Sequence, residues 1–128
     1  MLLNHVNIRT KNLIDMIDWY EKILNLVNGP RPNFEFNGAW LYMNENAIVH
    51  LIDDPKSIKY NKHQQLEHFA LSSVGLDDFL NHITKNNVKY FCGILPQFGT
   101  KLVNIYDFDG NHIHVDFNWH ERSDLFNK

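Results

Sequence analysis

The stretch DFDGNHIHVDFN, residues 107–118, decides the fold class because it combines a tight turn with an amphipathic strand. Asp-Gly-Asn at residues 109–111 is typical of a turn whose backbone needs a positive φ. After the turn the residues alternate, so that His112, His114 and Asp116 share one strand face and apolar residues share the other. Two imidazoles and a carboxylate at every second position are side chains that a metal ion can use as ligands. The stretch therefore predicts a closing β-strand with a ligand-type face.

The composition is that of one folded domain with many histidines. The 128 residues carry a net charge of -3, eight histidines and 13% aromatic residues. No cluster of Lys and Arg is present to follow a phosphate backbone, so we expect no nucleic-acid partner. No apolar stretch approaches the roughly 18 residues of a membrane helix, and the N-terminus does not resemble a signal peptide, so we expect no membrane partner. The single cysteine, Cys92, excludes an intrachain disulfide and suits the cytoplasm.

The first half of the chain predicts a strand, a helix and a hairpin. Apolar residues alternate in the first strand and recur at helical spacing in the helix. The helix is followed by the Gly-Pro-Arg-Pro break and by two β-rich runs around an Asn-rich turn. The expected elements are a strand over 2–10, a helix over 12–26, a short strand from 26, and strands over 38–43 and 47–52.

The second half appears as a repeat of the first, after a polar linker over about 53–65. It predicts a strand over 66–73, a helix over 76–86, and strands over 88–94 and 100–106 before the closing stretch. Alignment of LNHVNIRT with LEHFALSS places His5 on His68, and alignment of AIVHL with NHIHV places His50 on His114. Two βαβββ modules, over about 1–55 and 66–118, are therefore predicted, each with histidines at equivalent positions.

The repeat and its histidines resemble the vicinal oxygen chelate superfamily, which includes glyoxalase I, extradiol dioxygenases, and fosfomycin and bleomycin resistance proteins. The segments that carry the resemblance are LNHVNIRTKNLIDMIDWYEKILNL, GPRPNFEFNGAWLYMNENAIVHLI, LEHFALSS and YDFDGNHIHVDF. The resemblance implies a single α+β domain over 1–128, in which two βαβββ modules form a curled mixed sheet, and it implies a homodimer. It also implies a divalent metal ion, Fe, Ni, Zn, Co or Mn, bound by the module-opening His5 and His68 and by the last-strand His50 and His114.

The sequence departs from the family pattern at the last strand of each module. The family motif DPDGNxIEL has a glutamate ligand where this chain has His114, and glyoxalase-type members commonly have glutamate where this chain has His50. A site of four imidazoles carries no ligand charge, which strengthens the ion as a Lewis acid. It also lacks the carboxylate base of glyoxalase-type chemistry.

Six further residues are candidates for the site. Asp116 is the catalytic candidate, either as a proton acceptor or as a partner that orients His114. Arg9 shares a strand face with His5 and suits a substrate carboxylate or phosphate, with a surface ion pair as the alternative. The other candidates for substrate contact are the loop residue Arg31, the strand residues Trp40 and Tyr42, for which core packing is equally open, and His112.

The preferred function is a metal-dependent enzyme that acts on a small oxygenated substrate chelated by the ion. A glyoxalase-like lyase or isomerase and a catechol-type dioxygenase are both open. The alternative is a binding or resistance protein of the bleomycin-resistance type, which holds a small molecule without turnover. In a third interpretation the histidines are incidental, and this predicts no affinity for metal.

Overall fold

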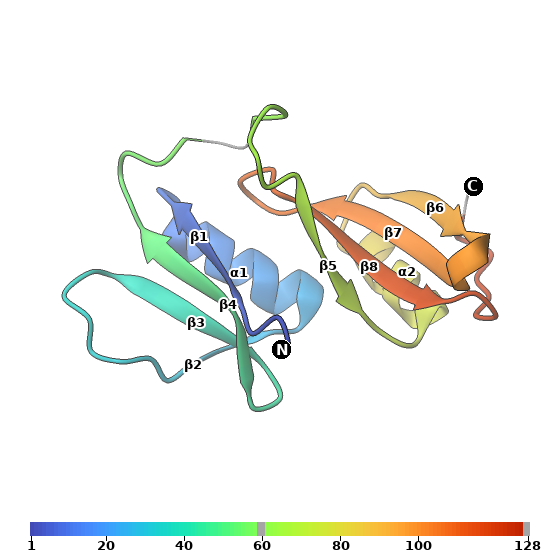
Figure 1. Ribbon diagram of the computed structural model, residues 1–128, viewed down its shortest axis with the longest axis horizontal. Helices are drawn as coiled ribbons and strands as arrows, with labels where there is room; N and C mark the ends of the chain where they lie inside the picture. Colours follow the sequence, from blue (N-terminus) through green and yellow to red (C-terminus); the bar gives the residue numbers. More distant parts are fainter. Residues whose placement is uncertain (59–60, 127–128) are drawn as a thin grey trace. The chain divides into compact units, whose positions relative to one another are not determined.

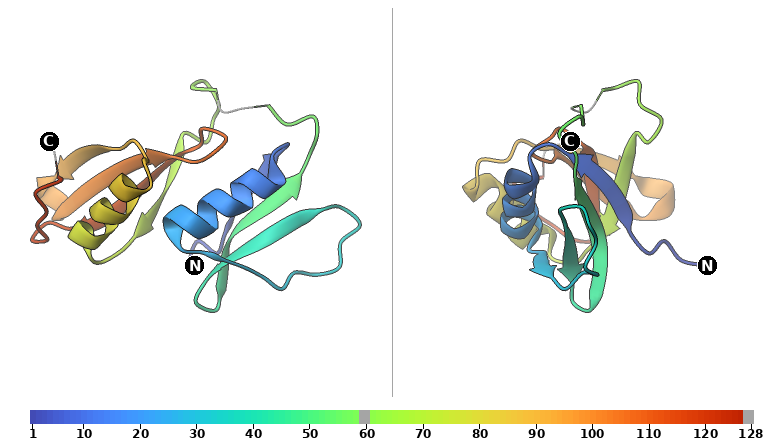
Figure 2. Two further views of the ribbon diagram at one scale, coloured as in Figure 1. Left: turned by 180° about the vertical axis from the view of Figure 1, so that it is seen from behind. Right: turned by 90° about the vertical axis from the view of Figure 1, so that its left-hand side faces the viewer.

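The computed structural model describes residues 1–58 and 61–126 and confirms the α+β fold of two βαβββ modules. Contacts between residues divide the chain into two compact units, with the division next to residue 60. Each unit is a four-stranded mixed sheet with one helix (Figures 1 and 2). We call them the N-terminal unit and the C-terminal unit and describe each by itself.

The N-terminal unit orders its strands as β1-β4-β3-β2. β1 runs parallel to β4, and the two other strand pairs are antiparallel. The parallel pair requires a crossover, and the helix α1 with the strands β2 and β3 supplies it. The elements are β1 (Val6–Thr10), α1 (Leu13–Leu24), β2 (Val27–Gly29), β3 (Gly38–Met43) and β4 (Asn46–Asp53).

The C-terminal unit repeats this topology with the order β5-β8-β7-β6. β5 runs parallel to β8, which places His68 opposite His112 and Ala70 opposite His114. A short 3₁₀ helix, η1, lies between β6 and β7 and was not expected from the sequence. The elements are β5 (His68–Ser72), α2 (Leu76–Lys85), β6 (Phe91–Leu95), η1 (Pro96–Phe98), β7 (Thr100–Tyr106) and β8 (His112–Asn118).

The core of each unit lies between its helix and one face of its sheet. In α2 the residues at helical spacing, Leu76, Leu80 and Ile83, are fully buried. The apolar face of β8 is buried as well, whereas His112, His114 and Asp116 on its other face are only half-buried. The predicted alternation of residues 112–117 is therefore confirmed, and the face that carries the ligand-type side chains is turned away from the core.

The closing stretch folds as its turn residues require. The carboxylate of Asp107, which is 5% exposed, accepts hydrogen bonds from the backbone N–H groups of Asp109 at 3.0 Å and Asn111 at 2.9 Å. It also accepts hydrogen bonds from the Asn111 side chain. Gly110 has a φ of 89°, which glycine adopts without strain. This turn determines where β8 begins. It therefore also determines which side chains of β8 lie on the same face as His112 and His114.

The first strand is shorter than the sequence predicts. β1 begins at Val6, so the expectation of a strand from residue 2 is wrong at its start. The register with β4 begins with the pair Val6 and Val49, and no strand partner extends it toward the N-terminus. Leu2 and Leu3 are 94% and 80% exposed, so their apolar alternation is not matched by burial. Alternation predicts a strand only where a neighbouring strand supplies hydrogen bonds.

Smaller shifts of boundaries affect other elements. α1 ends at Leu24 rather than residue 26 because Asn25 adopts a left-handed conformation with a φ of 56°. β6 begins at Phe91 rather than residue 88, after Asn87 with a φ of 58°. The predicted linker follows β4, and its residues 59–60 lie outside the described part of the chain. Within the described residues no helix has the length and apolarity to cross a membrane.

Candidate functional site

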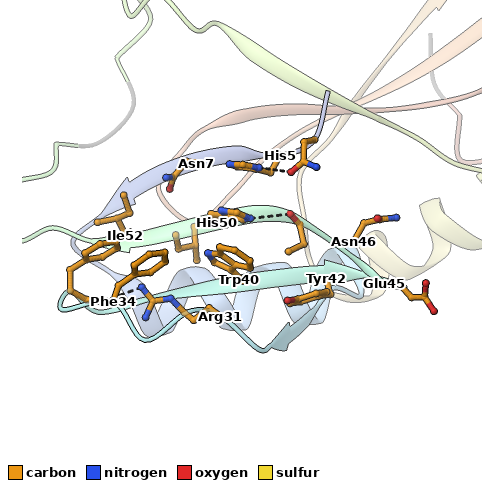
Figure 3. Close-up of a pocket in the computed structure, with 14 residues that line it drawn as sticks. His5, Asn7, Arg31, Phe34, Trp40, Tyr42, Glu45, Asn46, His50 and Ile52 are labelled. Atoms are coloured by element: carbon orange, nitrogen blue, oxygen red, sulfur yellow. Dashed lines mark hydrogen bonds between the residues drawn. The ribbon is translucent and has the colours of Figure 1, made fainter. Parts of the chain in front are cut away.

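The N-terminal unit contains a cavity of about 540 Å³ above the β3–β4 hairpin (Figure 3). Both predicted ligand histidines of this unit line it, as do three of the residues predicted to contact substrate. Most of the lining side chains are aromatic or polar, with a few aliphatic ones, which is the mixture that small-molecule cavities use for orientation and contact area. The lining residues that concern the argument are His5, His50, Arg31, Trp40, Tyr42, Phe34, Phe36, Asn4 and Asn7.

Three aromatic rings stack along one wall of this cavity. The ring of His50 lies 3.8 Å from the ring of His5, with an angle of 9° between the planes. On its other side His50 lies 4.1 Å from the ring of Trp40, at 15°. The register of the sheet produces this stack, because Trp40 is the cross-strand partner of His50. The stack brings the two predicted ligand residues of the N-terminal unit together.

One ring nitrogen of each histidine in the stack is held by an oxygen atom. Nδ1 of His5 lies 2.6 Å from Oδ1 of Asn4, and Nε2 of His50 lies 3.1 Å from the carbonyl oxygen of Ala47. Burial lowers the pKa of His50, and the positive charge of a protonated His5 lowers it further. His50 is therefore held neutral, with an N–H for Ala47 and a lone pair on Nδ1.

Arg31 approaches the cavity from the loop between β2 and β3. Its guanidinium lies 5.1 Å from the centre of the Phe34 ring and 5.4 Å from that of Phe36, and it donates to the carbonyl oxygen of Phe36 at 3.1 Å. Its Nε is buried and has no hydrogen-bond partner among the described residues. A Cβ atom at Gly38 would lie 2.2 Å from the backbone oxygen of Leu51, so glycine is required for the close approach of these two backbones; the same Cβ would lie 3.2 Å from Nη2 of Arg31. Arg31 thus brings a positive charge to an aromatic-lined cavity.

The other predicted substrate contacts of the N-terminal unit are placed differently. Trp40 and Tyr42 line the cavity, and the hydroxyl of Tyr42 donates to the carbonyl oxygen of Pro30 at 2.6 Å, which fixes the Arg31 loop. Arg9 does not line it. Arg9 is 68% exposed in its side chain and forms an ion pair with Asp54 at 3.4 Å. The ion pair that the sequence left open is therefore formed, and a substrate contact for Arg9 stays a prediction.

The C-terminal unit brings its own two predicted ligands together. The rings of His68 and His114 have their centres 4.5 Å apart, because β5 and β8 are parallel neighbours. Nδ1 of His114 lies 2.5 Å from Oδ1 of Asp116. A histidine that donates Nδ1–H to a carboxylate presents the lone pair of Nε2, which is the usual arrangement of metal-binding or proton-accepting imidazoles. Asp116 therefore contacts His114, and its catalytic or orienting role stays a prediction.

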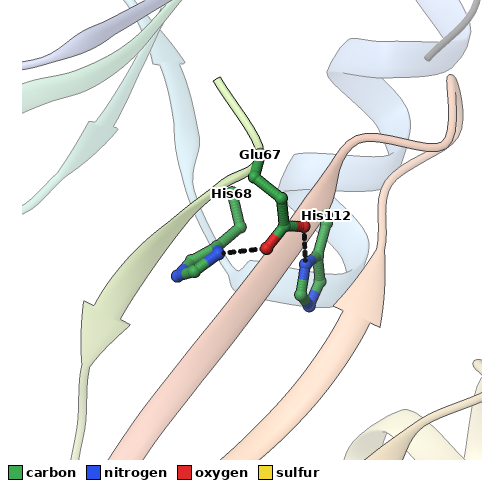
Figure 4. Close-up of side chains that lie close together, drawn as sticks. All are labelled: Glu67, His68 and His112. Carbon is green, nitrogen blue, oxygen red and sulfur yellow. Dashed lines mark hydrogen bonds and ion pairs between the residues drawn. The ribbon is translucent and has the colours of Figure 1, made fainter. Parts of the chain in front are cut away.

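Glu67 is a functional candidate that sequence reasoning missed (Figure 4). One carboxylate oxygen lies 2.7 Å from Nδ1 of His68, and the other lies 2.8 Å from Nδ1 of His112. The hydrogen bond to His112 and then that to His68 lower the pKa of the Glu67 carboxyl. The sequence places Glu67 beside His68, but the contact with His112 depends on the pairing of β5 with β8.

His112 has an oxygen acceptor at each ring nitrogen. Its Nδ1 lies beside the Glu67 carboxylate, and its Nε2 lies 2.9 Å from Oδ1 of Asn104. The ring of Tyr106 stacks on His112, with the centres 5.1 Å apart. Only 12% of the His112 side chain is exposed. The sequence predicts a contact of His112 with substrate, and this stays a prediction; the structure adds its contacts with Glu67 and Asn104.

The sequence matches the family model of the Glyoxalase/Bleomycin resistance protein/Dioxygenase superfamily over residues 2–115. The chain belongs to this superfamily. The match spans both modules and all four predicted ligand histidines, so the resemblance seen in the sequence is confirmed. No curated protein matches the sequence significantly.

Solved structures of the superfamily share the fold at low sequence identity. A putative glyoxalase family protein from Bacillus anthracis is 16% identical, covers 92% of this chain and 95% of its own, and has a TM-score of 0.77. Glyoxalase I from Leishmania major is 16% identical, with coverages of 90% and 85% and a TM-score of 0.67. The fosfomycin resistance protein FosX from Listeria monocytogenes, as a mutant in complex with Mn(II) and a dihydroxypropylphosphonic acid, is 13% identical, with coverages of 89% and 89% and a TM-score of 0.70. At these identities the similarity shows the fold alone.

Proposed function

We propose that this superfamily member is a divalent-metal-dependent enzyme that acts on a small oxygenated substrate. The observation that carries the proposal is the pairing of histidines in both units, with His5 beside His50 and His68 beside His114. An incidental histidine has no reason to recur at the equivalent position of a second module and to lie beside its counterpart there. The proposed ligands are the four histidines predicted from the sequence.

The donor chemistry fits such an ion. In three of the four residues one ring nitrogen lies beside a fixed oxygen, that of Asn4, Ala47 or Asp116, which leaves the other nitrogen as a lone-pair donor. Imidazole ligands suit Fe, Ni, Zn and Co, and Mn(II) is present in the FosX relative. A bound ion would polarise a substrate oxygen and stabilise negative charge that develops on it.

Substrate binding and proton positioning are the proposed roles of three side chains of this protein. Arg31, which lines the aromatic cavity of the N-terminal unit, binds an anionic group of the substrate through the positive charge of its guanidinium. Trp40 provides a flat apolar wall for the substrate. Asp116 holds the proton on Nδ1 of His114 and so keeps Nε2 able to accept a proton or bind the ion.

Two reaction classes fit this description, a glyoxalase-like lyase or isomerase reaction and a catechol-type dioxygenase reaction. The metal that the protein retains would separate them. Iron would favour oxygen activation, whereas nickel, zinc or cobalt would favour proton transfer in a lyase or isomerase.

The test is the metal content of protein purified without a histidine tag, by elemental analysis. We expect about one ion per chain in the wild type and a clear loss in His5→Gln and His68→Gln. His120→Gln is the matched control because His120 is exposed and lies outside the histidine pairs. Circular dichroism confirms that each variant is folded. A wild type that retains no metal after reconstitution contradicts the proposal and favours the small-molecule binding protein instead.

A further inference from the structure

Glu67 contacts more histidines than the other residues whose oxygen atoms lie beside a proposed ligand histidine. Asn4, Ala47 and Asp116 each face one histidine, whereas Glu67 faces two, His68 and His112. Its two carboxylate oxygens are divided between the two Nδ1 atoms. The three donor groups are held within 4.8 Å of one another. They lie in a single unit, on β5, on β8 and on the residue that precedes β5.

The hydrogen bonds of His112 show which of its nitrogens faces the cluster as a lone pair. The side-chain amide of Asn104 is oriented because its Nδ2 donates to the carbonyl oxygen of Phe91 at 3.2 Å. Its Oδ1 is therefore an acceptor for Nε2–H of His112. In the neutral ring Nδ1 then carries the lone pair, and it points at a carboxylate oxygen only 2.8 Å away.

A lone pair and a carboxylate oxygen repel each other unless a positive species lies between them. A proton on each ring is one such species, and a single divalent cation that binds both rings and the carboxylate is the other. Neighbouring ligands of an ion with bonds of about 2.1 Å lie about 3.0 to 3.4 Å apart, so donors at 2.7 and 2.8 Å need only small movements to bind one. The side chains of Glu67 and His68 are 57% and 38% exposed, so an ion and its water ligands have access.

We infer that Glu67 and His112 bind the divalent ion together with His68, so that the centre contains two imidazoles and one carboxylate in place of imidazoles alone. His68 binds through Nδ1, which faces Glu67, while Figure 4 shows its other nitrogen pointing away from the cluster. Asn104 orients His112 by accepting its Nε2–H. Glu67 thus supplies the carboxylate that the last strand lacks, from the residue before β5.

This inference deepens the proposed function and rests on it for the existence of a metal ion, but it can fail separately. It adds Glu67 and His112 to His68 as donors, and it holds whether or not any of the other three histidines binds the same ion. Two imidazoles and one carboxylate leave open positions on an octahedral or tetrahedral ion, and small oxygenated substrates bind at such positions. The ligand class is a divalent cation of the Fe, Co, Ni and Zn series.

The test uses cysteine as a spectroscopic marker of direct coordination. Glu67→Cys and His112→Cys are purified, stripped with chelator and titrated with Co(II), because a thiolate bound to Co(II) gives an intense charge-transfer band in the near ultraviolet. Wild type provides the baseline, since Cys92 lies on β6 outside the three donors. His114→Cys is the matched variant for the last-strand position predicted from the sequence.

The inference expects the band in Glu67→Cys and in His112→Cys, and expects it to disappear when His68→Gln is added to either variant. It also expects Glu67→Gln and His112→Gln to bind Co(II) at least tenfold more weakly than wild type, while circular dichroism is unchanged.

A band in His114→Cys without one in Glu67→Cys or His112→Cys overturns the inference and leaves the proposed function standing. Unchanged Co(II) affinity in Glu67→Gln and His112→Gln, with loss in His114→Gln, has the same meaning. Failure of the wild type and of every variant to bind Co(II), Zn(II) or Mn(II) overturns the inference and the proposed function together.

Discussion

At the scale of single residues, the site histidines differ in the oxygen atoms that hold them. His5 has an amide oxygen, His50 a backbone carbonyl, and His114 a carboxylate. A carboxylate raises the basicity of the imidazole that it orients, whereas a backbone carbonyl in a buried site does so less. Residues of one type at equivalent positions of a repeat therefore lie in different chemical surroundings.

His50 should make the stability of the metal-free protein depend on pH. Its folded-state pKa lies below the ordinary value of 6.5 because of burial and then because of His5. As pH falls below 6.5, the unfolded chain takes up the proton first, so the free energy of unfolding decreases; above 6.5 the full contribution is present. In chelator, we expect His50→Phe to lose less stability than wild type between pH 7 and 5, by urea denaturation. An equal loss in both proteins, with His120→Phe as the control, would contradict this assignment.

Asp107 should be a large contributor to stability for a turn residue. Its carboxylate is buried and accepts from two backbone N–H groups and one side-chain amide. Asp107→Ala leaves those donors without their acceptor, so we expect a loss of about 1–3 kcal/mol in the free energy of unfolding. Urea denaturation measures it, and Asp124→Ala, at an exposed position, should change little. If the free energies of unfolding of Asp107→Ala and of wild type differ by less than the experimental error, the prediction is wrong and water replaces the carboxylate as acceptor.

At the scale of elements, the parallel pairing of β5 with β8 brings the histidines of the C-terminal unit together. In that register His68 lies opposite His112 and Ala70 lies opposite His114, so the small alanine leaves room beside the His114 ring. A shift of one residue would turn every ligand-type side chain of β8 toward the core. Burial of Ile113, Val115 and Phe117 prevents that shift and so positions the histidines.

The N-terminus of α2 depends on a residue from the C-terminal tail. Oε1 of Glu121 accepts from the backbone N–H groups of Gly75 at 2.7 Å and Leu76 at 2.8 Å, and α2 has no side-chain cap of its own. A carboxylate at this end also complements the helix dipole. We expect Glu121→Ala to lower the free energy of unfolding by about 1 kcal/mol, measured by urea denaturation. Arg122→Ala, at the exposed neighbouring position, is the control, and equal effects of the two changes would contradict the capping role.

At the scale of the whole molecule, we expect two exposed apolar side chains to take part in association of the chain. Leu2 and Leu3, in the segment before β1, are 94% and 80% exposed. Isolated apolar residues on a surface are ordinary, but two adjacent leucines near His5, a proposed ligand, are costly to leave in water. They agree with the homodimer that the family resemblance implies.

The dimer is testable by mass. Light scattering after size-exclusion chromatography should give about 30 kDa, twice the 15.2 kDa of one chain. The double variant Leu2→Ser and Leu3→Ser should shift the equilibrium toward the monomer, because it removes roughly 3 kcal/mol of apolar burial per chain. Lys11→Ser, an exposed polar change, should leave the mass unaffected. A wild type that elutes as a 15.2 kDa monomer at all concentrations would contradict the dimer.

The sequence alone determined the repeat, the order of elements and the histidine positions. Alternation in residues 112–117 and helical spacing in 76–83 are local patterns, and each reports directly which side of an element is buried. The tight turn at 107–111 is equally local, because Asp107 bonds within four residues of itself. For the same reason the resemblance to the superfamily was visible before any coordinates.

Only the tertiary structure decided which side chains meet. Glu67 and His112 are 45 residues apart, and no local pattern joins them; their contact follows from the parallel register of β5 and β8. The stack of His5, His50 and Trp40 likewise depends on the pairing of β3 with β4 and on the residue that precedes β1. Residues 2–5 show the reverse case, in which a strand pattern lacks a partner and remains irregular. Periodicity determines which face of an element is buried, but only pairing between distant strands determines which side chains meet.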